Sequence, residues 1–304
     1  MIFGPVPTKQ AKGSILAHSI FCSGRRLRKG MTLEEADIEL LSASGVNEVT
    51  VAQLQDKDVH ENQAAAELAE ALVPDVKAAG LERTSAFTGR VNLVAAGPGV
   101  VAQQTDRLIA LNSIDPMITF ATVPNYQQMQ KGGLVGTVKI ISYAVDEEKL
   151  RSACAMGAAA IKLMPPRLKT ASLLVSQGAN RSDEKGISAI KSRLDALGIT
   201  LEKVITSEHD INPMARALST LSSELLLILT SSATSDPNDT APAAVRAAGG
   251  QIDRFGIPVD PGNLLFLGHI QSRPVIGFPG CVRSPALNGA DWVLSQIACG
   301  VSLD

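Results

Sequence analysis

The sequence predicts an α/β protein, with a doubly wound, mostly parallel sheet in its C-terminal part and an N-terminal mixed α+β module. From residue 171 onward, strand-like and helix-like segments alternate with short links, the pattern of right-handed crossovers. The strand-like segments are continuous apolar runs, which is typical of strands buried on both faces. Apolar residues make up 45% of the 304 residues and aromatic residues only 3%, so the core is built from small aliphatic side chains.

The C-terminal elements follow one another regularly. Strands are expected at residues 171–176, 201–206, 224–230, 253–259, 264–267 and 275–278. Helices are expected at residues 184–197, 211–221, 241–248 and 284–298. The loops after Ser176, Thr230 and Phe278 follow the carboxyl ends of three strands, where ligands bind in such sheets. We therefore expect these three loops to face one crevice.

The N-terminal half has a different pattern of expected helices and strands. A helix is expected at residues 32–43, with Thr32 and Glu35 as a capping box. A strand is expected at 46–54 and a second helix at 58–72.

Short strands and Gly, Pro or Asn turns fill residues 87–145, which indicates a mixed β module. The Pro165-Pro166 pair indicates a boundary. It divides the chain into an N-terminal module of residues 1–166 and an α/β domain of residues 167–304.

Bulk properties exclude several classes of protein. The net charge is −2, so no global field recruits nucleic acid or an anionic membrane. The four cysteines are widely spaced and form neither a zinc ribbon nor a disulfide framework, which fits a reducing cytoplasm. The N-terminus has no signal-peptide pattern, and no apolar run is long enough to span a membrane. We expect a cytoplasmic protein without nucleic-acid or membrane partners.

The most informative stretch is residues 274–285, a buried strand followed by an abrupt Pro279-Gly280 turn. The pattern predicts a helix after the turn, capped by Ser284. Unpaired N–H groups at such a helix start, together with the charge of Arg283, would form an anion site. Cys281 could be a nucleophile with a lowered pKa there, but no histidine lies nearby in sequence, and a small residue facing the pocket is the simpler interpretation.

The region from about residue 168 onward resembles the molybdopterin-binding domain shared by the MogA and MoeA proteins and by gephyrin. Residues 229–242 (LTSSATSDPNDTAP) parallel the family's T-G-G-T-G-x-x-P-R-D-x-T-P-E loop, with matches at Thr230, Pro237, Asp239 and Pro242. Residues 277–284 (GFPGCVRS) parallel G-L-P-G-N-P-x-S, and residues 257–263 stand where the family has x-x-x-K-P-G-K. The N-terminal segments 25–33 and 37–51 are similar to those of the longer, MoeA-like members.

The chain also departs from the family pattern. Ser231 and Ser232 replace paired glycines, and the lysines of K-P-G-K are Asp260 and Asn263. The arginine before the aspartate is Asn238, and the family's T-G-D-E loop reads QGAN at residues 177–180. Several cations and carboxylates for phosphate and metal are therefore missing, so the resemblance implies the fold and a pterin ligand better than it implies turnover.

The resemblance implies a molybdopterin or molybdenum-cofactor ligand in molybdenum cofactor biosynthesis. It implies Asp239 as a catalytic residue that could hold Mg²⁺. The implied ligand-binding residues belong to the two loops: Ser231, Ser232, Ala233, Thr234, Asp236, Gly277, Pro279, Gly280, Cys281, Arg283 and Ser284. If the chain is an enzyme, it inserts molybdate into an adenylylated pterin, with ATP or AMP as further ligands.

The sequence leaves alternatives open. The chain could be a non-catalytic cofactor carrier or an assembly partner of a molybdoenzyme; a nucleotidyltransferase has little support, because no glycine-rich nucleotide loop is seen. The resemblance also implies a homo-oligomer. Asp239 and Asp210 could each be a helix cap. The serine-rich loop, Arg283 and the basic cluster at residues 25–29 could each be solvated surface.

Overall fold

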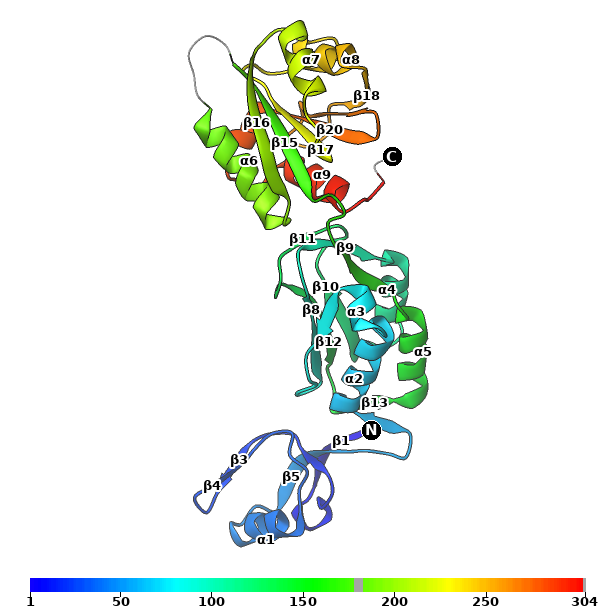
Figure 1. Cartoon of the computed structure of the whole chain (residues 1–304). Helices are drawn as coiled ribbons and strands as arrows, with labels where there is room; N and C mark the ends of the chain where they lie inside the picture. Colours follow the sequence, from blue (N-terminus) through cyan, green and yellow to red (C-terminus); the bar gives the residue numbers. More distant parts are fainter. Residues whose placement is uncertain (178–182, 303–304) are drawn as a thin grey trace. The chain divides into compact units, whose positions relative to one another are not determined.

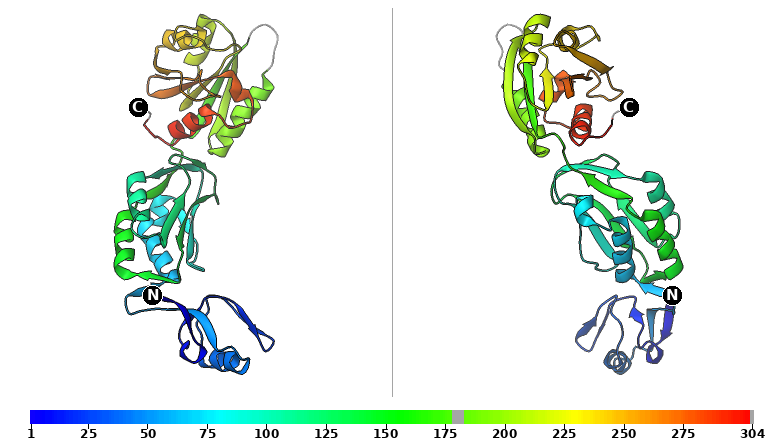
Figure 2. Two further views of the ribbon diagram at one scale, coloured as in Figure 1. Left: turned by 180° about the vertical axis from the view of Figure 1, so that it is seen from behind. Right: turned by 45° about the vertical axis from the view of Figure 1, so that its right-hand side comes forward.

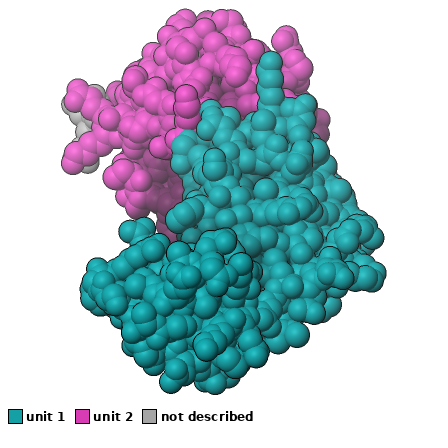
Figure 3. All heavy atoms as spheres, turned by 90° about the horizontal axis from the view of Figure 1, so that it is seen from below, with its two compact units in different colours: residues 1–96, 102–125, 132–162 teal, residues 97–101, 126–131, 163–304 magenta. Residues whose placement is uncertain are grey.

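The computed structural model describes residues 1–177 and 183–302, which form two compact units (Figure 3). The first unit comprises residues 1–96, 102–125 and 132–162. The second comprises residues 97–101, 126–131 and 163–304. The expected domain boundary after residue 166 stays a prediction.

The first unit begins with a small sheet of order β1-β5-β2, a hairpin and a helix. Its elements are β1 (Ile2–Pro7), η1 (Thr8–Gln10), β2 (Ile15–Leu16), β3 (Ile20–Cys22), β4 (Arg25–Leu27), α1 (Glu35–Ala43) and β5 (Glu48–Gln53). Buried leucines and valines, among them Leu16, Leu27, Leu41 and Val51, form its core.

The first unit continues with an antiparallel sheet of order β10-β12-β8-β7. Helix α2 packs against β8 and β12, and α5 packs against both α2 and α4 (Figure 1). These elements are β7 (Leu81–Arg83), β8 (Arg90–Ala95), β10 (Ile118–Thr122), β12 (Leu134–Ile140), α2 (Glu61–Leu72), α4 (Thr105–Asn112) and α5 (Glu147–Gly157). The remaining elements of the N-terminal half are β6 (Asp58–His60), α3 (Val76–Ala79), β9 (Gly99–Gln103), β11 (Gln128–Met129), β13 (Ala144–Asp146) and β14 (Ile161–Met164).

The second unit contains a six-stranded sheet of order β16-β15-β17-β20-β19-β18 in its described part. The first three neighbouring pairs, from β16 to β20, are parallel, whereas β19 and β18 are antiparallel to their neighbours. The strands are β15 (Thr170–Gln177), β16 (Thr200–Glu208), β17 (Leu225–Leu229), β18 (Gly250–Phe255), β19 (Phe266–Ile270) and β20 (Arg273–Phe278). The sheet is thus mixed and mostly parallel, which confirms the predicted fold class.

Helices cover both faces of this sheet. Helices α6 (Glu184–Ala196) and α9 (Gly289–Ala298) bury Leu194 and Leu294 on one face, against Leu227 of β17. Helices α7 (Ile211–Ser219) and α8 (Thr240–Ala247) bury Met214 and Val245 on the other (Figure 2). Because β17 lies between two helical layers, all five of its residues are buried, as its continuous apolar run predicts.

Two helix starts in the first half were predicted wrongly. Helix α1 begins at Glu35 rather than at Thr32, because Thr32 pairs with Ile15 in a β-bridge. Glu34 and Asp37 form the capping box instead. The helix expected from Asp58 begins at Glu61, because residues 58–60 are strand β6, paired with β13.

Helix α4 was missed in the region read as short strands and turns. The helix expected at residues 284–298 begins only at Gly289, where Asn288 caps it. A short 3₁₀ helix, η2 (Gly280–Arg283), follows the Pro279 turn instead.

None of the helices in the described part of the chain is both long and apolar enough to cross a membrane.

Candidate functional site

Polar contacts tie the loops together at the carboxyl ends of the parallel strands. The Ser231 backbone N–H, after β17, donates to Ser176 Oγ at the end of β15, at 3.0 Å. The ring of His209, just after β16, is hydrogen-bonded to Ser176 Oγ at 2.9 Å through Nδ1 and to Ser232 Oγ at 3.1 Å through Nε2. The end of β15 and the loop after Thr230 therefore meet, whereas most of the loop expected after Ser176 lies outside the described residues. His209 was missed; its place directly after a strand was the available signal.

Arg283 connects the loop after β20 to the same edge of the sheet. Its Nε and Nη2 lie 2.7 and 2.6 Å from the Asp183 carboxylate, and Nη2 also donates to the Thr230 carbonyl at 2.7 Å. Arg283 is therefore neither an unengaged surface arginine nor the free charge that the sequence suggested. Its third nitrogen, Nη1, donates no hydrogen bond to any described residue. The expected loop contribution from residues 178–180 lies outside the described residues.

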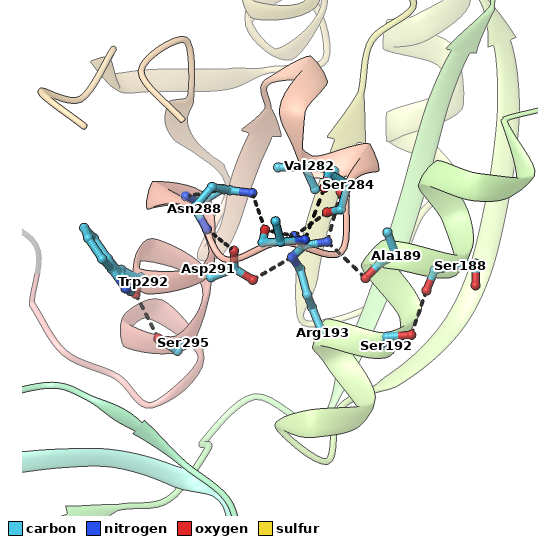
Figure 4. Close-up of polar contacts among 12 residues, drawn as sticks. Ser188, Ala189, Ser192, Arg193, Val282, Ser284, Asn288, Asp291, Trp292 and Ser295 are labelled. Carbon is cyan, nitrogen blue, oxygen red and sulfur yellow. Dashed lines mark hydrogen bonds and ion pairs between the residues drawn. The ribbon is translucent and has the colours of Figure 1, made fainter. Parts of the chain in front are cut away.

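A buried arginine fixes the chain that follows. Arg193 of α6 is only 9% exposed and lies 2.6 Å from the Asp291 carboxylate of α9 through Nε. Its other nitrogens donate to the carbonyls of Ala189, Val282, Ser284 and Ala286 (Figure 4). This arginine holds residues 282–286 against α6, so Ser284 cannot begin a helix.

A groove of about 810 Å³ lies beside this arginine within the second unit. Lys185, Ser188 and Ser192 of α6 line one wall. Arg283, Pro285 and Leu287 line the other. Lys185 is exposed and pairs with no described residue. An ammonium group and a guanidinium nitrogen on one groove can bind a phosphate monoester.

The loop of residues 231–239 forms an exposed turn before α8. Within it, Thr234 is buried, whereas Ser231, Ser232, Ala233 and Asp236 are exposed. Asp239 is the N-cap of α8: its carboxylate accepts from the backbone N–H of Thr240 at 2.7 Å and of Ser235 at 3.0 Å. The cap interpretation of Asp239 is confirmed. Asp210 likewise caps α7, accepting from the Asn212 N–H.

Magnesium fits this loop poorly. Both oxygens of Asp239 already accept backbone hydrogen bonds, and Asp236 Oδ1 accepts from the Asn238 N–H at 2.7 Å. Mg²⁺ requires oxygen ligands in octahedral geometry. Among the described residues, no group of three or more His, Cys, Asp or Glu side chains could hold a metal ion. We therefore derive no reaction step through a metal at Asp239.

The capping role gives a pH-dependent prediction. The Ser235 backbone N–H holds the pKa of Asp239 below its usual range. The ionised cap therefore contributes stability above the unfolded-state pKa, and this contribution is lost as the pH falls through the folded-state pKa. Asp239→Ala is expected to lower the free energy of unfolding by about 1 kcal/mol at pH 7. Urea unfolding should show that difference shrinking toward pH 3; a difference that is constant with pH would contradict the ionised cap.

The remaining predicted site residues lie around η2. Pro279 is buried at its start, Gly280 is exposed, and Ser284 Oγ accepts from the Ala286 N–H at its far end. Burial raises the pKa of the Cys281 thiol. The raised pKa is opposite to the lowered thiol pKa expected for a nucleophile, and η2 is a single short turn, so the structure gives the nucleophile interpretation of Cys281 no support. Gly277 lies buried in β20, beneath the Phe266 ring.

Comparison with known proteins gives little beyond this geometry. A family model described as a domain of unknown function (DUF8806) matches residues 5–53, a small part of the chain. No curated protein matches the sequence.

Two solved structures are distantly similar. The molybdopterin biosynthesis MoeA protein from Pyrococcus horikosii aligns over 92% of this chain and 70% of its own, at 13% identity and a TM-score of 0.30. The nicotinate-nucleotide pyrophosphorylase from Francisella tularensis aligns over 64% of this chain and 91% of its own, at 7% identity and a TM-score of 0.19. Similarity at this level does not establish what this chain binds.

Proposed function

We propose that the second unit binds a phosphorylated pterin of the molybdopterin type, with its phosphate at the groove between α6 and η2. The observation that carries this proposal is the pair of cations on that groove, Lys185 and the unengaged Nη1 of Arg283. Their position at the carboxyl ends of β15 and β20 is where ligands bind in sheets of this kind. The choice of a pterin as the rest of the ligand comes from the loop motifs that resemble the molybdopterin-binding domain.

The charge of the groove supports one phosphate rather than a chain of phosphates. Asp183 already pairs with Arg283, and Asp291 already pairs with Arg193. What remains for a ligand is the charge of Lys185 and the one unengaged nitrogen of Arg283, with the carboxylate of Glu184 also on the groove. A phosphate monoester dianion matches these donors better than the triphosphate of a nucleoside triphosphate does.

The same contacts favour a carrier over a molybdate-inserting enzyme. The carboxylate that the resemblance assigns to a metal, Asp239, is a helix cap. The glycines that would bring backbone N–H groups to a pyrophosphate are Ser231 and Ser232. In this role the chain would hold the cofactor and deliver it to a molybdoenzyme.

Binding of a fluorescent, oxidised pterin carrying a phosphate monoester tests the site. Lys185→Ala is expected to weaken binding about tenfold to hundredfold, because a hydrogen bond to a charged group contributes about 1.5–3 kcal/mol. Lys191→Ala is the matched control on the same helix, because Lys191 pairs with Asp195 and does not line the groove. This variant should bind the probe with the affinity of wild type.

The dephosphorylated pterin separates charge recognition from ring recognition. It should bind wild type and Lys185→Ala equally. If Lys185→Ala and Lys191→Ala bind the phosphorylated probe alike, the phosphate does not lie in this groove. If neither probe saturates at micromolar concentration, the pterin assignment itself is wrong.

A second assay distinguishes carrier from enzyme. The full chain is incubated with adenylylated molybdopterin, Mg²⁺ and molybdate, and AMP is measured. A carrier binds the pterin without releasing AMP. Release that depends on Asp239 would establish catalysis and overturn the carrier proposal.

A further inference from the structure

A second cavity, of about 690 Å³, lies between α9 and the antiparallel strands β18 and β19. It shares no lining residue with the groove at α6 and η2. Its volume is within the range of small-molecule sites. The proposed phosphate site does not involve it, and of the segments that resemble the family only residues 257–263 reach it, through Ile257.

The wall of this cavity is apolar along α9. Val293 and Ile297 of α9, together with Ile257, line it and pack only partly buried against the core. Leu267 and Pro274 line it from β19 and β20. These side chains leave apolar surface open to an occupant, and removing such surface from water is favourable.

The polar rim is formed by a bulge in β18. The register against β19 shifts between Ile252 and Arg254, so Asp253 is the extra residue of the strand. Successive residues of a regular strand point to opposite faces. The bulge instead lets both Asp253 and Arg254 line the cavity, and bulges commonly re-aim side chains beside binding sites.

The bulge leaves one unpaired cation at the rim, beside a histidine that is already hydrogen-bonded. The Asp253 carboxylate lies 2.9 Å from Nδ1 of His269, which fixes the ring and leaves Nε2 without a partner among the described residues. Arg254 is exposed and forms no ion pair or hydrogen bond with any described residue. An unpaired guanidinium beside an apolar wall is complementary to an anionic group on an apolar body.

We propose that this cavity binds a small amphipathic acid. Its carboxylate, sulfonate or phosphate is held by Arg254, beside the Asp253–His269 pair at the rim. Its apolar body lies along Val293, Ile297 and Leu267.

The probe is 1-anilinonaphthalene-8-sulfonate, an aromatic anion of suitable size, titrated into the folded full chain. Wild type is expected to show one saturable class of binding. Arg254→Glu should weaken that binding at least about tenfold, because it replaces attraction by repulsion. Arg216→Glu is the matched control, an exposed arginine on α7 over the opposite face of the sheet, and should bind as wild type does.

Competition separates charge from general hydrophobicity. Decanoate should displace the probe from wild type, whereas decyltrimethylammonium, with the same chain and opposite charge, should not. Near-ultraviolet circular dichroism of each variant checks that the fold is retained. The proposal is overturned if Arg254→Glu and Arg216→Glu bind alike, if the cation displaces the probe equally well, or if no saturable binding occurs.

Discussion

Replacing Arg193 with methionine is expected to lower the free energy of unfolding of the second unit by about 3–5 kcal/mol, because one partner of a buried ion pair is removed. The loss leaves the Asp291 carboxylate, only 11% exposed, without its cation. It also removes the donor for the carbonyls of Val282, Ser284 and Ala286. Urea unfolding followed by circular dichroism measures the change.

The matched control is Lys191→Met, two residues before Arg193 on α6. Lys191 pairs with Asp195 on an exposed surface, so the change should stay within about 0.5 kcal/mol. Asp291→Asn should recover part of the loss in the Arg193→Met background, since it removes the orphaned charge. An effect of Arg193→Met as small as that of Lys191→Met would show that the ion pair does not fix residues 282–286.

The second large effect is expected at Gly277, the penultimate residue of β20. A Cβ there would lie 1.9 Å from Cε1 of Phe266, a ring that is itself only 1% exposed. Phe266 packs in one buried cluster with side chains of α7 and α8, so the ring cannot move aside without disturbing the core. Gly277→Ala is therefore expected to lower the free energy of unfolding by about 3 kcal/mol, the upper part of the range for overpacked cores.

Gly280→Ala is the control, three residues further along the same loop motif. Its Cβ would meet only Arg283 Nη1, at 3.6 Å, so stability should change by less than about 1 kcal/mol. In a Phe266→Leu background, Gly277→Ala should be less costly, and a double-mutant cycle measures that coupling. If the two glycine variants are equally stable, Gly277 is not required for packing under Phe266.

The physical reason for Gly277 differs from the one its motif suggests. The resemblance places this glycine among the ligand-binding residues, whereas in the structure it accommodates an aromatic ring of the core. The C-terminal fold could be predicted because a continuous apolar run, such as that of β17, indicates a strand that is buried on both faces. The antiparallel direction of β19 relative to β18 and β20 was not predicted, because it depends on contacts between strands that are not visible in the sequence.

The site was predictable only in outline. The convergence of loops follows from parallel strands ending at one edge. The contact of Arg283 with Thr230 confirms it for the loops after Thr230 and Phe278, and that of Ser231 with Ser176 brings in the end of β15. The partners were not predictable. Arg193 lies 98 residues from Asp291 in the chain, and no local pattern indicates that pair. Its hold on residues 282–286 is the reason that the expected helix at Ser284 does not form.

The groove was likewise invisible to sequence patterns. No sequence pattern separates Lys185 from Lys191, the other lysine of α6; only the packing against η2 places Lys185 on the groove. Asp239 shows the converse: its cap role was recognisable from the sequence, and the structure adds that both of its oxygens are engaged.

The most direct measurement of the central claim is a crystal structure of the full chain with a phosphorylated pterin. The account predicts phosphate density between Lys185 and Nη1 of Arg283, with the Asp183 contact of Arg283 retained. Phosphate density at residues 231–239 with the groove empty, or a ligand coordinated through Asp239 and a metal ion, would contradict it.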